Sequence, residues 1–206
     1  MTKSLLVALL GTVAVPAQGQ PSSSPAIIEP STDTPAEQQA LRSLTMCLAQ
    51  IRPHWARGVL DQPYLSAAQA SAAAQAVSGR DHCQQQPEVE MTFRTSTLVS
   101  ALAEYYLRAD LPKTDSLRLN QALGSLPARN ASEDFGLCLA SHNPAAAREL
   151  ALSEPGTSVE ANSAQTLGAQ VQACSLRGES LKVDLQSLRA LVTVALYRAV
   201  SSVSRS

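Results

Sequence analysis

The chain contains the tripeptide Cys-Leu-Ala twice, at Cys47 and at Cys138, and each copy is followed by a proline, an alanine and an arginine in the same register. The offset between the two copies is 91 residues. Two further cysteines, Cys83 and Cys174, keep this offset, so the sequence separation within each pair is 36 residues. Any fold for this chain must therefore accommodate two similarly built segments.

A helix-start signal follows the same offset. Ser66-Ala-Ala-Gln69 and Thr157-Ser-Val-Glu160 both fit the capping box, in which a hydroxyl accepts from the N3 amide and the Glu or Gln side chain reaches back to the N-cap amide. Nearer the end of each copy the offset becomes 90 residues, as though one residue had been lost. These matches together predict an internal duplication.

The composition predicts that the duplicated units are helical. The chain is 45% apolar, mostly through Ala and Leu, and only 3% aromatic. Ala and Leu favour helices, whereas aromatic and β-branched residues favour strands. A unit of about 70 residues is small for an independent core, so we expect one compact all-α body with three to four helices per unit, arranged about a pseudo-twofold axis. The predicted segments are a first unit over residues 35–111, a linker with a short helix over residues 112–129, and a second unit over residues 130–202.

The N-terminal segment has the features of a cleaved signal peptide. Lys3 supplies a positive charge, and an apolar run of 11 residues from Leu5 to Val15 precedes small residues that fit a cleavage site. This run is shorter than the ~20 residues that a membrane span needs. We therefore predict a signal peptide over residues 1–19 and a flexible Pro- and Ser-rich leader over residues 20–34. The mature protein would be exported to the periplasm or the extracellular space, without a transmembrane segment.

Four cysteines in an exported chain predict two disulfides. Three pairings are open, and the equal spacing in the two units favours Cys47–Cys83 and Cys138–Cys174. On the chain-entropy model, each bridge would contribute about 3.5–4 kcal/mol. A metal site is the alternative, because each of the three histidines lies near a cysteine. The chain has no Cys-x-x-Cys or His-x-x-x-His pair, however, so we predict neither a metal nor another cofactor.

The charge pattern and the motifs indicate neither a nucleic-acid-binding protein nor an enzyme. The net charge is −1, and Lys and Arg are scattered along the chain. Nucleophile elbows, Gly-rich phosphate loops and His-Glu-x-x-His helices are absent from the sequence. Glu133 and Asp134 follow Ser132 at a predicted helix start, where negative charge suits the helix dipole. Converging Arg and Glu side chains in a cleft would instead favour an enzyme.

The polar residues that do recur between the units are arginines, Arg57 with Arg148 and Arg108 with Arg198. One interpretation makes them contacts for an anion or a partner, such as a carboxylate or a lipid or glycan phosphate. The interpretation that we prefer is structural: each arginine lies near a helix C-terminus or in an internal salt bridge.

Aromatic residues are too few to form a core by themselves. Trp55 and the pair Tyr105-Tyr106 could anchor a partner, since aromatic side chains often do so at interfaces. In a chain with so few aromatic residues, we predict instead that they fill the interior.

A resemblance to known proteins rests on four features of the chain. They are the Cys-Leu-Ala motif, the proline six residues after the first cysteine, the second cysteine, and the Leu-Tyr-Arg near the end of the last predicted helix. In these features the chain resembles small exported, all-helical proteins of α-proteobacteria, sphingomonad-like ones in particular, which have no assigned activity. The segment Cys83-Gln-Gln-Gln-Pro87 and the following helix to Arg108 are similar to a Cys-x-Pro and helix of periplasmic immunity proteins of the Rap1a/Tai type. The duplication and the cysteine spacing depart from that second pattern, so no residue roles carry over.

These observations favour a non-enzymatic, exported helical protein that binds an envelope protein or a surface component. Such a protein would expose an apolar or aromatic patch. Two alternatives stay open. One is a carrier of a small apolar or amphipathic ligand, held in an enclosed pocket between the two units. The other is a protein that acts like a periplasmic immunity protein or inhibitor.

Overall fold

The computed structural model describes residues 28–29, 35–78, 83, 94–175 and 182–205, and these residues form an all-α fold, as predicted. The α-helices of the described residues are α1 (Pro35–Ile51), α2 (Pro53–Asp61), α3 (Ala67–Ser78), α4 (Thr95–Asp110), α5 (Ser116–Ser125), α6 (Ala131–His142), α7 (Pro144–Leu152), α8 (Ser158–Gly168), α9 (Val171–Cys174) and α10 (Leu185–Arg205). A 3₁₀ helix, η2 (Leu111–Lys113), follows α4. The predicted signal peptide lies outside the described residues.

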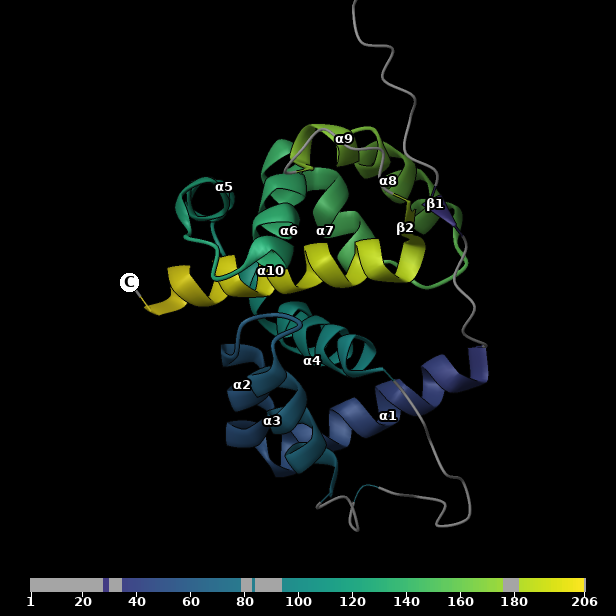
Figure 1. The fold of residues 1–206 in the computed structure, drawn as a ribbon, viewed down its shortest axis with the longest axis vertical. Helices are drawn as coiled ribbons and strands as arrows, with labels where there is room; N and C mark the ends of the chain where they lie inside the picture. Colours follow the sequence, from purple (N-terminus) through teal and green to yellow (C-terminus); the bar gives the residue numbers. More distant parts are fainter. Residues whose placement is uncertain (1–27, 30–34, 79–82, 84–93, 176–181, 206) are drawn as a thin grey trace, which may run out of the picture.

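The helices form two groups on either side of α10 (Figure 1). α1 to α4 lie below α10 in this view, and α6 to α9 lie above it. A two-residue strand in the predicted leader, β1 (Ile28–Glu29), pairs in parallel with β2 (Val183–Asp184) just before α10 begins. None of the helices in the described part of the chain combines the length and the apolar character needed to cross a membrane.

The starts of three pairs of helices, α2 and α7, α3 and α8, and α4 and α10, follow the offsets seen in the sequence. α2 and α7 each have nine residues, and each begins with a proline, Pro53 or Pro144, 91 residues apart. Proline is favoured at the first position of a helix because its missing amide hydrogen would have no partner there. α4 and α10 begin 90 residues apart, at Thr95 and Leu185. The linker also contains its predicted short helix, α5.

The loops before α3 and α8 share an uncommon backbone conformation. The described residues with positive φ are Leu65, at 60°, and Gly156, at 77°, again 91 residues apart. The predicted capping contacts follow directly, with one difference: the Gln and Glu side chains accept from the amide one residue before the N-cap rather than from the N-cap amide itself. The Ser66 and Thr157 hydroxyls accept from the amides of Gln69 and Glu160, at 3.1 and 3.3 Å. The Gln69 and Glu160 side chains reach back to the amides of Leu65 and Gly156, at 2.9 and 2.7 Å.

The core is centred on the contact between α4 and α10. Both helices contribute fully buried leucines, among them Leu98 and Leu102 from α4 and Leu188 and Leu196 from α10. Three pairs join the helices in the same order along both: Thr97 with Gln186, Glu104 with Arg189 and Tyr106 with Tyr197. The two helices therefore run in the same general direction.

On its other side, α10 packs closely against α6. Gly136 of α6 faces the backbone of α10, where an added Cβ would lie 2.8 Å from the carbonyl oxygen of Leu191. Only a residue without a side chain allows this approach, so Gly136 sets the distance between the two helices.

Both predicted disulfides are present. Cys47 of α1 is bonded to Cys83, and Cys138 of α6 is bonded to Cys174 of α9, with Cα–Cα distances of 5.6 and 5.7 Å. Each bridge ties the cysteine-bearing helix at the start of its group to a point 36 residues further along the chain.

Candidate functional site

Two clusters of charged side chains join the two groups of helices, and the first is centred on Glu133. Asn130 caps α6, and its side chain accepts from the amide of Glu133 at 3.0 Å. The cap places the Glu133 side chain at the start of α6, where only 1% of it is exposed. Two guanidinium groups neutralise this carboxylate: Arg129 approaches it to 2.6 Å and Arg198 of α10 to 2.8 Å. We refer to Glu133, Arg129, Asn130 and Arg198 as the Glu133 cluster.

The Glu133 cluster holds the loop between α2 and α3. The backbone amide of Tyr64 donates to Glu133 at 2.8 Å, and the Asn130 side chain donates to the carbonyl oxygen of Tyr64 at 2.7 Å. Arg129 also donates to the carbonyl oxygens of Asp61 and Gln62. These carbonyls end α2, so the guanidinium provides partners that the helix itself cannot supply.

The Glu133 carboxylate is stabilised in its charged form. Burial by itself raises the pKa of Glu133, but the hydrogen bonds from Arg129 and from the backbone amides of Tyr64 and Arg129, together with the charge of Arg198, outweigh it and lower the pKa. A buried ion with this many donors is a structural anchor, and removing any of its partners is expected to cost more than breaking a surface ion pair.

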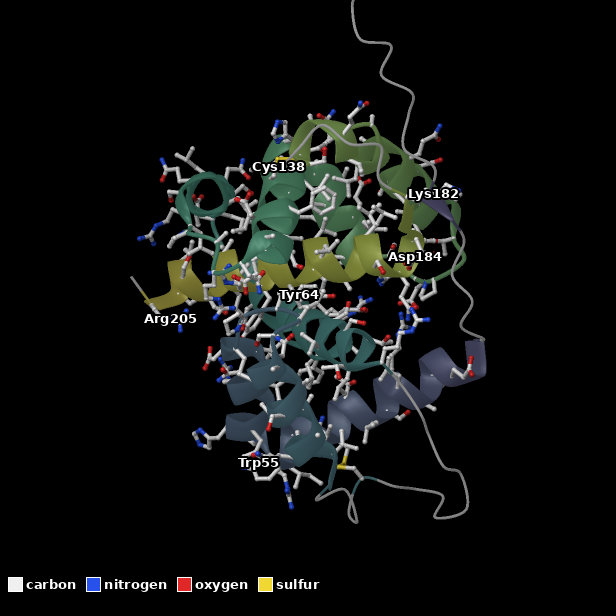
Figure 2. The ribbon with its side chains drawn as sticks, viewed as in Figure 1. Trp55, Tyr64, Cys138, Lys182, Asp184 and Arg205 are labelled. Atoms are coloured by element: carbon white, nitrogen blue, oxygen red, sulfur yellow. A yellow bond between two sulfur atoms is a disulfide. The ribbon has the colours of Figure 1, made fainter. Side chains whose placement is uncertain are left out.

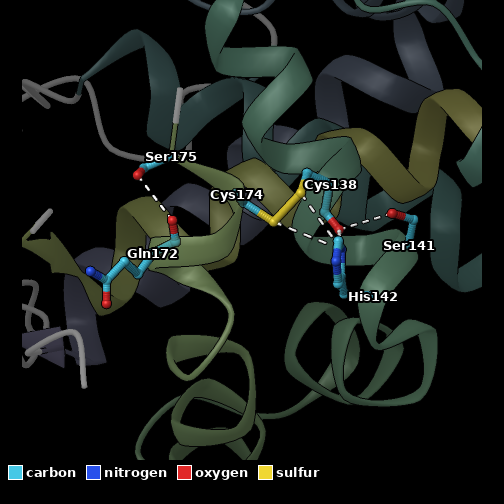
Figure 3. Close-up of a disulfide and its surroundings, with 6 residues drawn as sticks. All are labelled: Cys138, Ser141, His142, Gln172, Cys174 and Ser175. Atoms are coloured by element: carbon cyan, nitrogen blue, oxygen red, sulfur yellow. Dashed lines mark hydrogen bonds between the residues drawn. A yellow bond between two sulfur atoms is a disulfide. The ribbon is translucent and has the colours of Figure 1, made fainter. Parts of the chain in front are cut away.

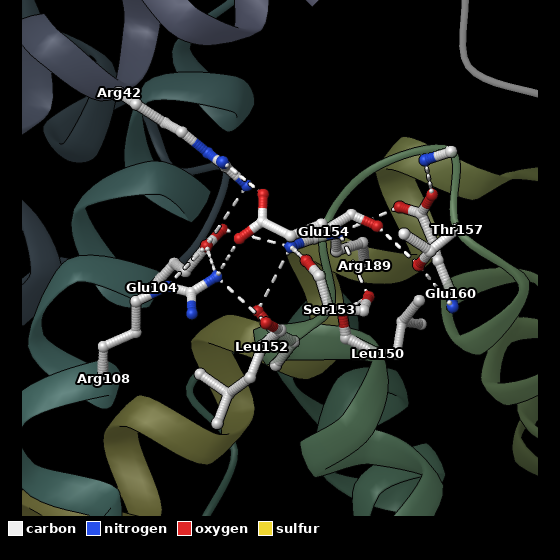
Figure 4. Close-up of polar contacts among 12 residues, drawn as sticks. Arg42, Glu104, Arg108, Leu150, Leu152, Ser153, Glu154, Thr157, Glu160 and Arg189 are labelled. Carbon is white, nitrogen blue, oxygen red and sulfur yellow. Dashed lines mark hydrogen bonds and ion pairs between the residues drawn. The ribbon is translucent and has the colours of Figure 1, made fainter.

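The second cluster is centred on Arg189 of α10 (Figure 4). Only 10% of this side chain is exposed, and it lies between two carboxylates, that of the buried Glu160 of α8 at 2.9 Å and that of the partly buried Glu104 of α4 at 3.3 Å. Its guanidinium also donates to the carbonyl oxygens of Ser153 and Ala151, at 2.6 and 3.4 Å. Arg189 thus holds the loop between α7 and α8, the counterpart of the loop held by Glu133.

Around Arg189, Glu104 and Glu160 lie three further ions whose side chains are more exposed (Figure 4). Arg42 of α1 pairs with Glu154 at 2.6 Å, and Arg108 pairs with Glu104 at 2.7 Å and donates to the carbonyl oxygen of Leu152 at 2.9 Å. We refer to the six ions as the Arg189 cluster: Arg42, Glu104, Arg108, Glu154, Glu160 and Arg189. Three arginines thereby balance three glutamates, and every carboxylate is paired with a guanidinium. The Arg and Glu side chains do converge, but in mutual ion pairs that suit structural support rather than acid–base chemistry.

The four arginines that recur in the sequence do not form a common site. Arg108 and Arg198 belong to different clusters. Arg57 lies over the ring of Tyr106, 4.6 Å from its centroid, and Arg148 donates to the hydroxyl of Ser116 at 3.2 Å. Arg108 and Arg198 form internal salt bridges, in line with the structural interpretation, whereas the contacts of Arg57 and Arg148 are of other kinds and neither residue lies in the last turn of its helix. Their use as anion or partner contacts stays a prediction.

The aromatic residues divide between the interior and the surface. Tyr106 is buried, with 6% exposed, as predicted. The prediction that Trp55 fills the interior is wrong, because 45% of it is exposed. The short helix α2 already buries Ala56, Val59 and Leu60, and Trp55 lies at the edge of that stripe.

Trp55 is one of three large apolar side chains that are exposed in the last half of α1 and the first turn of α2. Met46 is 49% exposed and Ile51 is 53% exposed, close to Trp55 in sequence and on consecutive helices. The guanidinium of Arg52 stacks over the Trp55 ring, 4.9 Å from its centroid. We call Met46, Ile51 and Trp55 the apolar corner. Figure 2 places Trp55 at the end of the molecule opposite Cys138.

The Cys138–Cys174 disulfide has an imidazole beside it (Figure 3). Nδ1 of His142 lies 3.6 Å from Sγ of Cys138 and 3.9 Å from Sγ of Cys174. Three potential metal ligands are thus within 4.8 Å of one another. The two sulfurs are bonded to each other, however, so in this state they are not thiolates and do not offer the ligand set of a metal site.

A groove of about 400 Å³ lies between α5 and the C-terminal part of α10. Its lining includes Arg118 and Gln121 of α5 and Ser202 of α10, alongside apolar side chains. The groove differs from the enclosed Leu- and Ala-lined pocket between the units that a carrier would need.

Sequence patterns did not predict the burial of the two ions at the cluster centres, Glu133 and Arg189. Asn130 and Glu133 have the spacing of a capping box, which predicts a helix start but not burial. Arg189 flanks an apolar run, and nothing in its local pattern separates an internal arginine from a surface one. Comparison of the chain with protein-family models, with curated proteins and with solved structures finds no match to any of them.

Proposed function

We propose that this protein is an exported, internally duplicated helical protein that binds a partner protein of the cell envelope through the apolar corner. One observation carries the proposal: three large apolar side chains within ten residues of one another, Met46, Ile51 and Trp55, are each 45–53% exposed, on two consecutive helices of which the first is tied by a disulfide. Tryptophan and its apolar neighbours are common anchors of protein interfaces.

The apolar corner is well prepared for binding. Cys47 lies between Met46 and the end of α1, and its bond to Cys83 restrains this end of the helix. Arg52 holds the Trp55 ring in a defined orientation by stacking on it. A side chain that is already ordered loses less conformational entropy when a partner covers it, which favours affinity.

Export is supported by the two disulfides, which persist in oxidising compartments, and by the signal-peptide pattern of residues 1–19. Duplication is supported by the matching starts of α2 and α7 and by the positive φ of Leu65 and Gly156 at the same offset. A chance match of an uncommon backbone conformation, a capping box and a disulfide at one offset would be a rare coincidence.

A comparative pull-down tests the proposal. The oxidised mature protein is immobilised, and proteins retained from envelope extracts are quantified for the wild type, for an I51S/W55S double variant and for a matched control, L117S. Leu117 of α5 is 66% exposed and lies outside the apolar corner. Loss of an interface tryptophan typically costs about 2 kcal/mol or more, which corresponds to roughly 30-fold weaker binding.

We expect I51S/W55S to lose a specific set of proteins that the wild type and L117S both retain. If the double variant keeps every protein that the wild type captures, the apolar corner is not the binding surface. Circular dichroism of the three proteins checks that the substitutions leave the fold intact.

A further inference from the structure

We propose that Cys138–Cys174 is a reducible disulfide that exchanges with an external dithiol, and that His142 stabilises the thiolate released when the bond opens. Cys47–Cys83 would be the structural counterpart. This inference is independent of the apolar corner, of which Trp55 lies at the other end of the molecule from Cys138 (Figure 2).

The position of His142 carries the inference. Its Nδ1 lies 2.9 Å from the carbonyl oxygen of Cys138. A carbonyl oxygen can only accept, so Nδ1 carries the hydrogen and is the donor. The same nitrogen lies 3.6 and 3.9 Å from the two sulfurs, so an N–H group is already placed beside both atoms of the bond (Figure 3). A thiolate next to such a donor is stabilised, and a stabilised thiolate is a better leaving group.

The exposure of the groups suits an exchange reaction. His142 is exposed and Cys138 is partly exposed, whereas Cys174 is 7% exposed. An attacking thiolate would therefore reach Sγ of Cys138, and the electron pair of the S–S bond would leave on Sγ of Cys174, within 3.9 Å of Nδ1. This step forms a mixed disulfide between Cys138 and the dithiol.

The second step completes the transfer. The remaining thiol of the dithiol attacks its own sulfur in the mixed disulfide, and Cys138 leaves as a thiolate within 3.6 Å of Nδ1. Overall, the dithiol loses two electrons and two protons and becomes a disulfide, while Cys138 and Cys174 become thiols. His142 is within reach of the leaving sulfur in both steps.

The other disulfide differs at the matching position. His142 follows Cys138 by four residues, and the residue that follows Cys47 by four is Ile51, which has no polar side-chain atom. The two bridges have the same sequence separation, so they offer an internal comparison within one molecule. A reagent added to the protein meets both bonds under identical conditions.

The test measures the initial opening rates of both disulfides in the oxidised full chain. The protein is treated with dithiothreitol and quenched with an alkylating reagent, and each cysteine peptide is quantified by mass spectrometry. The variants are H142I, which copies the residue at the matching position, and H142K, which places an N–H donor of a different side chain there. His142 is exposed, so neither change should disturb the core.

We expect H142I to slow the opening of Cys138–Cys174 by about three- to tenfold, because each unit of thiol pKa changes exchange rates by about threefold. The rate for Cys47–Cys83 should stay the same, and H142K should recover part of the loss. An unchanged rate for Cys138–Cys174 in H142I, or an equal slowing of both disulfides, would overturn the proposal.

Discussion

The Glu133 cluster and the Arg189 cluster occupy corresponding places but have opposite charges at their centres. Each holds the loop that follows the second helix of its group, α2–α3 in one case and α7–α8 in the other. Glu133 is an anion between two arginines, whereas Arg189 is a cation between two glutamates. Moreover, Arg42 of the second cluster is the residue 91 positions before Glu133.

The comparison shows what this architecture requires. In both places a buried ion supplies partners to loop backbone groups and ties together helices that are distant in the sequence. The sign of the ion is interchangeable as long as its partners have the opposite sign, because the requirement is neutrality and satisfied hydrogen bonds. The two junctions should nevertheless respond differently to mutation, to acid and to salt.

Removal of the cationic centre should have the largest effect. In R189M, Glu104 and Glu160 keep their charges at 14% and 8% exposure but lose their central guanidinium, and two loop carbonyls lose a donor. We expect the free energy of unfolding in urea to fall by about 3–5 kcal/mol. The triple variant R189M/E104Q/E160Q should regain part of this loss. If R189M is as stable as the wild type, the cluster does not hold the two groups of helices together.

Removal of the anionic centre should cost somewhat less. E133Q keeps the shape of the side chain, and the guanidiniums left behind, Arg129 and Arg198, are 31% and 12% exposed, so water can solvate them in part. We expect a loss of about 2–3 kcal/mol in the same urea measurement. Asp134, on the exposed side of α6, provides the control: D134N should change stability by less than about 0.5 kcal/mol. If E133Q and D134N lower the free energy of unfolding equally, Glu133 is no more important for stability than an exposed carboxylate.

Acid should distinguish the two centres. The pKa of Glu133 is lower in the folded protein than its ordinary value of 4.5, so folding favours its charged form. The stability that it contributes is fully present above the unfolded pKa and is lost as the pH falls through the folded pKa. A guanidinium keeps its charge throughout this range.

Unfolding free energies measured between neutral pH and about pH 3 should therefore show a smaller acid loss in E133Q than in the wild type. R189M retains Glu133, so the part of the acid loss that comes from this carboxylate should persist in that variant. If E133Q loses as much stability in acid as the wild type does, the Glu133 carboxylate is not the source of the acid-sensitive stability.

The smallest effect is expected at the exposed edge of the Arg189 cluster. Arg42 and Glu154 pair at 2.6 Å, but 35% and 60% of their side chains are exposed. R42Q and E154Q should each lower stability by less than about 1 kcal/mol, and added salt should remove most of the difference. A double-mutant cycle at low and high salt measures the coupling. If the coupling energy between Arg42 and Glu154 is the same at high salt, the pair behaves like a buried ion pair and this prediction is wrong.

Local signals in the sequence were sufficient to predict the helices and the disulfides. Pro53 and Pro144 begin helices for reasons that involve only their own backbone, and the capping boxes at Ser66 and Thr157 do the same. The cysteine pairing followed from equal spacing. These features depend on residues close in sequence, or on the comparison of one copy with the other.

The exposure of Trp55 and the burial of Glu133 depend on contacts between segments that are distant in the sequence. Helical periodicity identifies an apolar stripe, but it does not show whether a neighbouring helix covers Trp55. In the same way, Glu133 is buried because the loop before α3 lies over it, 69 residues away in the sequence. Pairwise tertiary contacts of this kind leave no local pattern, so the centres of both clusters were outside the reach of sequence reasoning.

The position of α10 in the chain has a consequence for biosynthesis. α10 packs against α4, α5, α6, α7 and α8. It contributes Arg189 to the Arg189 cluster and Arg198 to the Glu133 cluster. Ribosomes make α10 after every other described helix. Neither group of helices can therefore form its contacts with α10 until synthesis has passed residue 205. Until then, the apolar surfaces that meet α10 stay uncovered. In a chain made in this order, both groups of helices lack the helix that joins them until α10 is available.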